Sequence, residues 1–191
     1  MRVIAFLFLA VTLLVSTCFA QDGPVQLETS PPPAAPVSEL VKSVGSAAVK
    51  YIPVRDETRS EAGGIALSTG DSGWGSISAA FKYSGRAFRK PTDITLNFFI
   101  AAKDRVYVDN RRLIIIADEK LLLDTEAELK DGRTNGREVY SSLTAALSLA
   151  DFNKLANSGT AIFQVGPSKW LIPADRLSGF RDLLKIIEEG K

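Results

Sequence analysis

Two stretches decide the fold, SISAAFKY (residues 76–83) and ITLNFFIA (residues 94–101). In each, the larger apolar residues stand at every second position: Ile77, Ala79, Phe81 and Tyr83 in the first, and Ile94, Leu96, Phe98 and Ile100 in the second. Successive side chains of a strand point to opposite faces of its sheet, so this period of two predicts two strands that each bury one face. The other face of the second strand carries Phe99 and Ala101 and is only partly polar, so we expect it to be partly covered.

Further strands and turns are expected after these two. The predicted elements are a meander through Val106–Val108, Leu113–Ile116 and 121–130, a long hairpin that pairs 121–130 with Val139–Ala145, and a second hairpin of Ala161–Val165 with Lys169–Ile172. Asp, Asn and Gly residues stand between these segments, as turns require. The repeated connections indicate a mainly antiparallel sheet.

Two helices are predicted near the end of the sequence. Ser148 followed by Asp151 resembles a capping box at the start of a short apolar stripe that ends before Gly159. A final helix places Leu177, Phe180, Leu183, Leu184 and Ile187 on one side. Strands followed by helices indicate an α+β fold, mainly antiparallel β, either sandwich-like or a strongly curved sheet, with a short helix and a C-terminal helix packed on it.

Residues 37–72 are predicted to be a helical and irregular lead-in to a β-rich domain at 73–191. Apolar residues recur at helical spacing from Val37 to Tyr51, with Ser38 placed to cap the helix and Pro53 to end it. The β-branched residues and Gly45 weigh against this helix. From Glu61 to Gly75 the chain is rich in Gly and Ser, and we expect irregular structure with a short strand at Ile65–Leu67.

Residues 1–20 have the layout of a secretory signal peptide: Arg2, an apolar run from Val3 to Val15, and Ala20. We expect cleavage near Ala20, a secreted or periplasmic protein, and no membrane span after cleavage. A retained membrane anchor would need about 20 apolar residues, and Ser16 interrupts the run. Lipidation of Cys18 is the other alternative, but Val15 and Thr17 match a lipobox poorly.

Residues 21–36 predict an extended linker, because five prolines stand among small and polar residues. The alternative, a ligand for a proline-binding domain, has only composition in its favour. Arg2 is the only charged residue of residues 1–20, so the mature chain carries equal numbers of acidic and basic side chains. Zero net charge gives no attraction to nucleic acid.

The chain contains no His, and its one Cys lies in the predicted signal peptide. These absences exclude Ser-His and Cys-His triads, ordinary zinc sites and disulfides in the mature protein. No glycine-rich phosphate loop is present, and we expect neither a cofactor nor a metal. Asp109, Asp118 and Glu119 offer oxygen ligands for calcium, but they lack EF-hand spacing and fit solvated turns better.

Five residues are candidate binding residues. Trp74, between two glycines in an expected polar loop, can stack on a sugar or on a partner surface, or instead fold down over the sheet. Arg86, Arg89, Arg111 and Arg112 form a basic patch for an anionic polymer if the 84–91 loop lies near the meander turn. The alternative is a scattered, solvated set of charges.

The sequence favours an exported, non-catalytic binding or envelope-interaction module whose partner is a protein or a glycan of the cell envelope. The alternative is a secreted hydrolase of the glycosidase kind that uses two carboxylates among Asp124, Glu126 and Glu128. Such an enzyme needs one carboxyl group with a raised pKa, whereas alternate residues on an open strand face are solvated. We therefore expect no catalytic residue.

Overall fold

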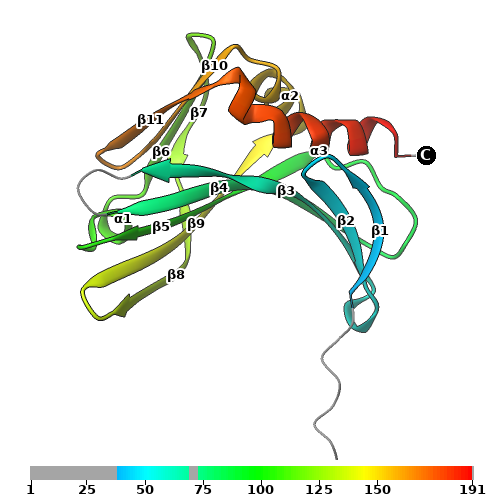
Figure 1. Cartoon of the computed structure of the whole chain (residues 1–191), viewed down its shortest axis with the longest axis horizontal. Helices are drawn as coiled ribbons and strands as arrows, with labels where there is room; N and C mark the ends of the chain where they lie inside the picture. Colours follow the sequence, from blue (N-terminus) through cyan, green and yellow to red (C-terminus); the bar gives the residue numbers. More distant parts are fainter. Residues whose placement is uncertain (1–37, 69–72, 191) are drawn as a thin grey trace, which may run out of the picture. The chain divides into compact units, whose positions relative to one another are not determined.

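The computed structural model describes residues 38–68 and 73–190, which belong to one compact unit (Figure 1). Within them the chain forms two antiparallel sheets, three α-helices and two short 3-10 helices. The predicted signal peptide (1–20) and linker (21–36) lie outside the described residues. No helix of the described part is long and apolar enough to cross a membrane.

Sheet A has seven strands, and sheet B has four. In spatial order, sheet A consists of β1 (Glu39–Val44), β2 (Ala47–Ile52), β3 (Glu57–Ser68), β4 (Trp74–Ser84), β5 (Asp93–Ala102), β9 (Glu138–Ser148) and β8 (Glu128–Asn135). Sheet B consists of β11 (Ser168–Pro173), β10 (Thr160–Val165), β6 (Arg112–Ala117) and β7 (Lys120–Glu126). The helices are η1 (Pro53–Arg55), α1 (Val106–Asp109), α2 (Leu149–Ala156), η2 (Ala174–Leu177) and α3 (Ser178–Glu188).

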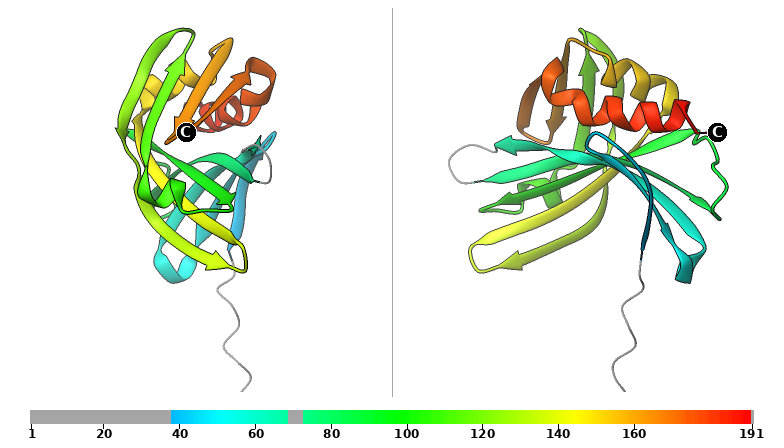
Figure 2. Two further views of the ribbon diagram at one scale, coloured as in Figure 1. Left: turned by 90° about the vertical axis from the view of Figure 1, so that its left-hand side faces the viewer. Right: turned by 45° about the vertical axis from the view of Figure 1, so that its right-hand side comes forward.

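One face of sheet A is covered, and the other is open. Helix α3 packs on β1, β2 and β3 and against α2, while sheet B lies over the same side of sheet A (Figures 1 and 2). Sheet A bends toward the side opposite α3 and sheet B, so its open face is concave (Figures 1 and 2). The predicted fold class, a mainly antiparallel β fold with a short helix and a packed C-terminal helix, is confirmed.

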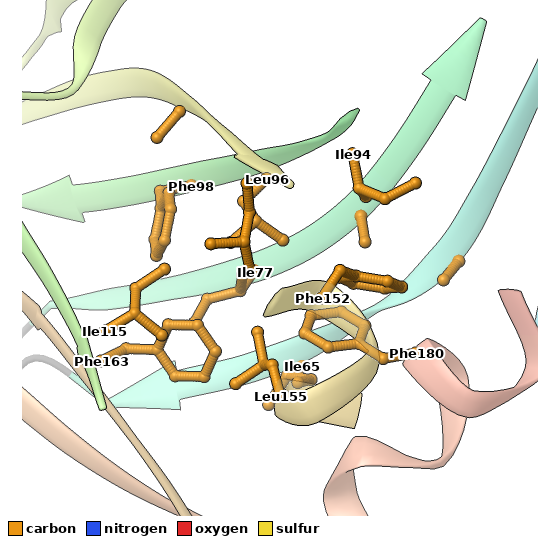
Figure 3. Close-up of a cluster of buried hydrophobic side chains, with 14 of the residues drawn as sticks. Ile65, Ile77, Ile94, Leu96, Phe98, Ile115, Phe152, Leu155, Phe163 and Phe180 are labelled. Atoms are coloured by element: carbon orange, nitrogen blue, oxygen red, sulfur yellow. The ribbon is translucent and has the colours of Figure 1, made fainter. Parts of the chain in front are cut away.

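The core fills the space between the two sheets and the two longer helices. Phe98 of β5 meets Phe163 of β10 with ring centroids 6.1 Å apart, and Phe152 of α2 meets Phe180 of α3 at 5.4 Å. Figure 3 shows these rings among Ile77, Ile94, Leu96 and Leu155. Complete burial of one such side chain contributes about 1.5–3 kcal/mol, so these contacts join the layers.

The helix predicted from Val37 to Tyr51 is wrong, because β1 and β2 form a hairpin there. Gly45 takes a φ of +53° in the turn, a backbone conformation that glycine adopts without strain. The Ser46 amide of this turn donates to Asp182 Oδ2 of α3 at 3.0 Å, so tertiary contacts favour the hairpin over a local helix. The chain after it is also β: β3 contains the short strand predicted at Ile65–Leu67 and begins already at Glu57, so Glu61–Gly64 is not irregular. The β-rich part begins at Glu39 instead of residue 73.

Two expectations for the meander also need correction. Val106–Val108 is not a strand, because the chain turns through α1 there, where the Val106 amide donates to Asp104 Oδ1 at 3.2 Å. The strand predicted over 121–130 is divided, with β7 in sheet B and β8 in sheet A. Buried Ala127 stands at the crossing, and its amide donates to the Arg111 carbonyl at 2.9 Å.

The remaining predicted elements are confirmed. Strands β4 and β5 contain the two stretches with period two, β8 pairs with β9, and β10 pairs with β11. The Ser148 hydroxyl accepts a hydrogen bond from the Asp151 amide at 3.1 Å and caps α2 as its sequence predicts.

Candidate functional site

Three aromatic side chains lie next to one another on the open face of sheet A: Trp74 of β4, Phe99 of β5 and Tyr140 of β9. The ring centroids are 5.3 Å apart for Trp74 and Phe99, and 5.9 Å apart for Phe99 and Tyr140. Trp74 is 50% exposed and Phe99 is 37% exposed, although large apolar side chains are usually buried. We term these three residues the aromatic row.

Small residues allow the aromatic row to form. A Cβ atom added to Gly75 would lie 2.6 Å from the Phe99 carbonyl oxygen, so only glycine lets β4 approach β5 this closely. Ala101 pairs with both Trp74 and Tyr140, and its methyl group is buried between these larger neighbours. The strand pairing therefore fixes the order of the three rings.

The phenol of Tyr140 is held by a carboxylate. Its hydroxyl donates to Glu138 Oε2 at 2.6 Å, and this hydrogen bond raises the pKa of Tyr140. The bond also restricts rotation of the side chain, so Tyr140 presents its ring in one orientation. The described contacts thus preorganise this end of the aromatic row.

A small hollow of about 330 Å³ lies beside the aromatic row. Its lining combines the two rings of Phe99 and Tyr140 with the polar residues Asp131, Arg133, Asn135 and Ser142. Arg133 Nε donates to Asp131 Oδ2 at 2.6 Å, which leaves the remaining N–H and oxygen positions of this pair to face solvent. The hollow thus offers both hydrogen-bond donors and acceptors next to an aromatic surface.

A larger groove of about 710 Å³ continues along the same open face and shares Ser142 with the hollow. Its floor carries hydroxyl and amide groups of Thr95, Asn97, Ser142 and Thr144. Its rims carry charges of both signs that pair locally, as in Lys82 with Glu57 at 3.5 Å and Lys130 with Glu128 at 2.5 Å. This mixture suits a polar ligand of low net charge, not a polyanion.

The structure places Trp74 at the start of β4, not in the expected loop. Its ring lies against Phe99 and remains half exposed, so it neither folds into the core nor stands alone. Trp170, the other tryptophan, is buried and donates from Nε1 to the Ser68 carbonyl at 2.6 Å. Of the two tryptophans, only Trp74 presents a ring on the open face.

The four arginines proposed for a basic patch lie in two parts of the chain. Arg86 lies 4.3 Å over the ring of Tyr51, and Arg89 is exposed in the loop between β4 and β5. Arg111 pairs with Glu126, and Arg112 pairs with Asp124 through two hydrogen bonds of 3.0 and 2.8 Å. Arg86 and Arg89 precede β5 in the chain, whereas Arg111 and Arg112 follow it.

The acidic residues proposed for a hydrolase all pair with basic residues. Arg112 lowers the pKa of Asp124, whereas a general acid needs a raised pKa. Glu126 pairs with Arg111, and Glu128 pairs with Lys130. These carboxylates are therefore partners of nearby cations.

The turn aspartate considered for calcium is used within the fold. Asp118 accepts hydrogen bonds from the amides of Gly159 at 3.2 Å and Thr160 at 3.0 Å, which ties the β6–β7 turn to the start of β10. Across residues 38–68 and 73–190, no group of three or more acidic or sulfur ligands is arranged to hold a metal ion.

Sequence reasoning identified Trp74 but missed Phe99 and Tyr140 as members of the site. The partly polar face of β5 was a signal for Phe99, while Tyr140 joins it only through the pairing of β5 with β9. The chain matches no known protein-family description, no curated protein and no solved structure.

Proposed function

We propose that this protein is an exported, non-catalytic binding module that holds a glycan of the cell envelope on the open face of sheet A. The observation that carries the proposal is the aromatic row, whose rings of Trp74 and Phe99 are 50% and 37% exposed. Exposed aromatic rings cost free energy in water, so a surface that keeps two of them beside the partly buried ring of Tyr140 is suited to a ligand that covers them.

A glycan fits the chemistry around these rings. One face of a sugar ring is made of C–H groups that pack on an aromatic ring, and its rim carries hydroxyl groups that donate and accept hydrogen bonds. The hollow places Asp131, Arg133 and Asn135 beside Phe99 and Tyr140, and the groove continues with Thr95, Asn97 and Thr144. A few polar groups beside an apolar surface are typical of small-ligand sites.

The absence of His from the whole sequence and the lowered pKa of Asp124 support a non-catalytic role. Export is supported by the charged start, apolar run and small residues of 1–20. Glu126 and Glu128, two of the carboxylates considered for a hydrolase, both line the larger groove, but they are exposed and pair with Arg111 and Lys130.

Tryptophan fluorescence tests the proposal directly, because the chain has only two tryptophans. A Trp170→Phe variant leaves Trp74 as the only reporter, and it keeps an aromatic ring in the core where Trp170 packs. We expect soluble oligosaccharides of at least one class, neutral, amino-sugar or uronic-acid, to shift the Trp74 emission to the blue and to protect it from acrylamide quenching.

The matched variants are Phe99→Ala, which removes a neighbouring ring, and Val54→Ala, which trims an exposed side chain on η1. Phe99→Ala should weaken glycan binding by more than about tenfold, while Val54→Ala should leave it unchanged. No response to any glycan class by the folded protein, or hydrolysis of a bound glycan, would contradict the proposal.

A further inference from the structure

The outer face of sheet B, which points away from the core, carries an exposed apolar stripe. Leu171 of β11 pairs with Ile162 of β10, Ile162 pairs with Ile116 of β6, and Ile116 pairs with Leu121 of β7. Directly paired residues of a sheet point to the same face, so these four side chains form one row across all four strands. We term them the sheet B stripe.

The sheet B stripe is poorly covered by the described residues. Leu121 is 62% exposed and Leu171 is 65% exposed, and the two isoleucines between them are half-buried. The neighbouring residues on the strands, such as Ile115, Ala161, Phe163 and Ile172, point to the other face and are buried in the core. Sheet B is therefore apolar on both faces, and contiguous apolar surface of this kind marks an interaction site.

We infer that the sheet B stripe binds a second copy of this chain, forming a two-fold symmetric dimer through the outer faces of two B sheets. The charges beside the stripe favour this occupant. In the next row, Lys169 stands on edge strand β11 and Asp124 stands on the opposite edge strand β7, with Gln164 and Ile114 between them. The row therefore has a positive end and a negative end.

A two-fold axis parallel to the strands makes this face self-complementary. The axis places β11 of one copy over β7 of the other, so stripe packs on stripe and Lys169 faces the partner's Asp124. Within the part of the chain that the structure describes, no carboxylate lies within ion-pair distance of Lys169. Asp124 is exposed and accepts one hydrogen bond from Arg112 on each oxygen, and each oxygen has a further lone pair for the partner's Lys169. The same surface thus supplies both members of each intermolecular ion pair.

The dimer would leave the aromatic row and the hollow beside it free, while β7 also lines the larger groove through Leu123, Thr125 and Glu126. Sheet B lies over the covered side of sheet A, so its outer face and the open face of sheet A are directed to different sides of the molecule (Figure 2). A dimer of this kind presents two open faces. Two linked sites increase the avidity for a repetitive polymer without any new contact.

Sedimentation velocity of the purified protein over a range of concentrations tests the dimer. We expect the wild-type protein to dimerise, and Leu171→Asp to raise the dissociation constant by more than about tenfold, because each interface would then bury two unpaired charges. Leu171 is largely exposed, so the variant should keep its unfolding midpoint. Val54→Asp, which adds the same charge at a 70% exposed position on η1, should dimerise as the wild type does.

A charge exchange separates the proposed geometry from a non-specific apolar contact. Lys169→Glu should weaken the dimer by placing two carboxylates opposite each other, and the double variant Lys169→Glu/Asp124→Lys should restore part of the loss. A wild-type protein that stays monomeric at its highest soluble concentration would overturn the inference. A dimer that Leu171→Asp leaves intact would also overturn it. The inference would fail as well if the protein is a monomer in which an apolar dye reaches the sheet B stripe only after residues 21–37 are deleted.

Discussion

Thr58 and Ser60 are buried hydroxyl residues two positions apart on the covered face of β3, and their surroundings differ. Thr58 Oγ1 donates to the Gly85 carbonyl at 2.6 Å, whereas Ser60 Oγ has no hydrogen-bond partner among the described residues. A buried hydroxyl without a partner costs free energy, while a buried hydroxyl with one is close to neutral or favourable. The two residues therefore contribute to stability with opposite signs.

Ser60→Ala should raise the free energy of unfolding by about 1 kcal/mol, because it removes a polar group that nothing satisfies. Thr58→Val should lower it by about 1 kcal/mol, because the Gly85 carbonyl loses its donor. Chemical denaturation of the two variants measures both changes. Equal losses of stability in the two variants would show that Ser60 is hydrogen-bonded in solution.

Gly75 is the residue on which the aromatic row depends most directly. Gly75→Ala should destabilise the protein by about 1–3 kcal/mol and weaken ligand binding, because the new methyl group would force β4 away from the Phe99 carbonyl. Gly64→Ala is the matched control, since its Cβ would make only ordinary contacts, the nearest being Ser76 Cβ at 3.4 Å. Similar denaturation midpoints for the two variants would contradict the close approach at Gly75.

At the scale of the element, one aspartate stabilises helix α2 and another stabilises the β1–β2 hairpin. Lys154 and, to a smaller degree, the Ser148 hydroxyl lower the pKa of Asp151 in the first turn of α2. Asp182 of α3 accepts from the Ser46 amide in the hairpin turn. The Asp151 carboxylate accepts from the hydroxyl that caps its own helix, and the Asp182 carboxylate attaches a hairpin to a helix that is distant in sequence.

The Asp151 contribution should depend on pH. Its native pKa lies below the unfolded value of about 3.9, so the stabilisation is present above that pH and is lost as the pH falls through the native pKa. Asp151→Asn should therefore lose less stability on acidification than the wild type does. Thermal unfolding at pH 7 and at roughly pH 3 measures this difference, and parallel curves for the two proteins would contradict it.

Asp182→Ala should loosen the β1–β2 hairpin while the rest of sheet A keeps its stability. The Ser46 amide loses its acceptor, and local opening of an edge hairpin costs little free energy. Hydrogen exchange should accelerate for the amides of Ala47–Ile52 and stay unchanged in β5. Uniform acceleration across sheet A would instead assign Asp182 to global stability.

The sequence predicts an element well where one face is apolar and the other polar. Strands β4, β5 and β9 and helices α2 and α3 come closest to this condition, and periodicity predicts where each of them lies, although not its ends. The β1–β2 hairpin could not be predicted in this way, because its apolar residues also fit helical spacing and its turn depends on a contact with α3. The site shows the same limit: Trp74 is visible in the sequence, but its proximity to Phe99 and Tyr140 depends on strand register.

At the scale of the whole molecule, the two sheets share one core. Phe163 of sheet B packs between them against Phe98, and both rings are fully buried. Phe163→Ala should cost about 3–5 kcal/mol and should lower the midpoint of a single unfolding transition seen by both far- and near-ultraviolet circular dichroism. Leu123→Ala should cost less, since Leu123 is only partly buried. Two separate transitions would show that the sheets unfold independently.

Strand β8 forms one edge of sheet A, where a further strand could pair. Its unpaired edge carries the ion pairs Glu128–Lys130 and Asp131–Arg133, and a bulge between Leu129 and Asp131 interrupts its regular pleat. Charges and bulges on an edge strand prevent another strand from adding to the sheet. The protein can therefore keep a wide, ligand-accessible sheet in solution without that sheet becoming a template for fibril growth.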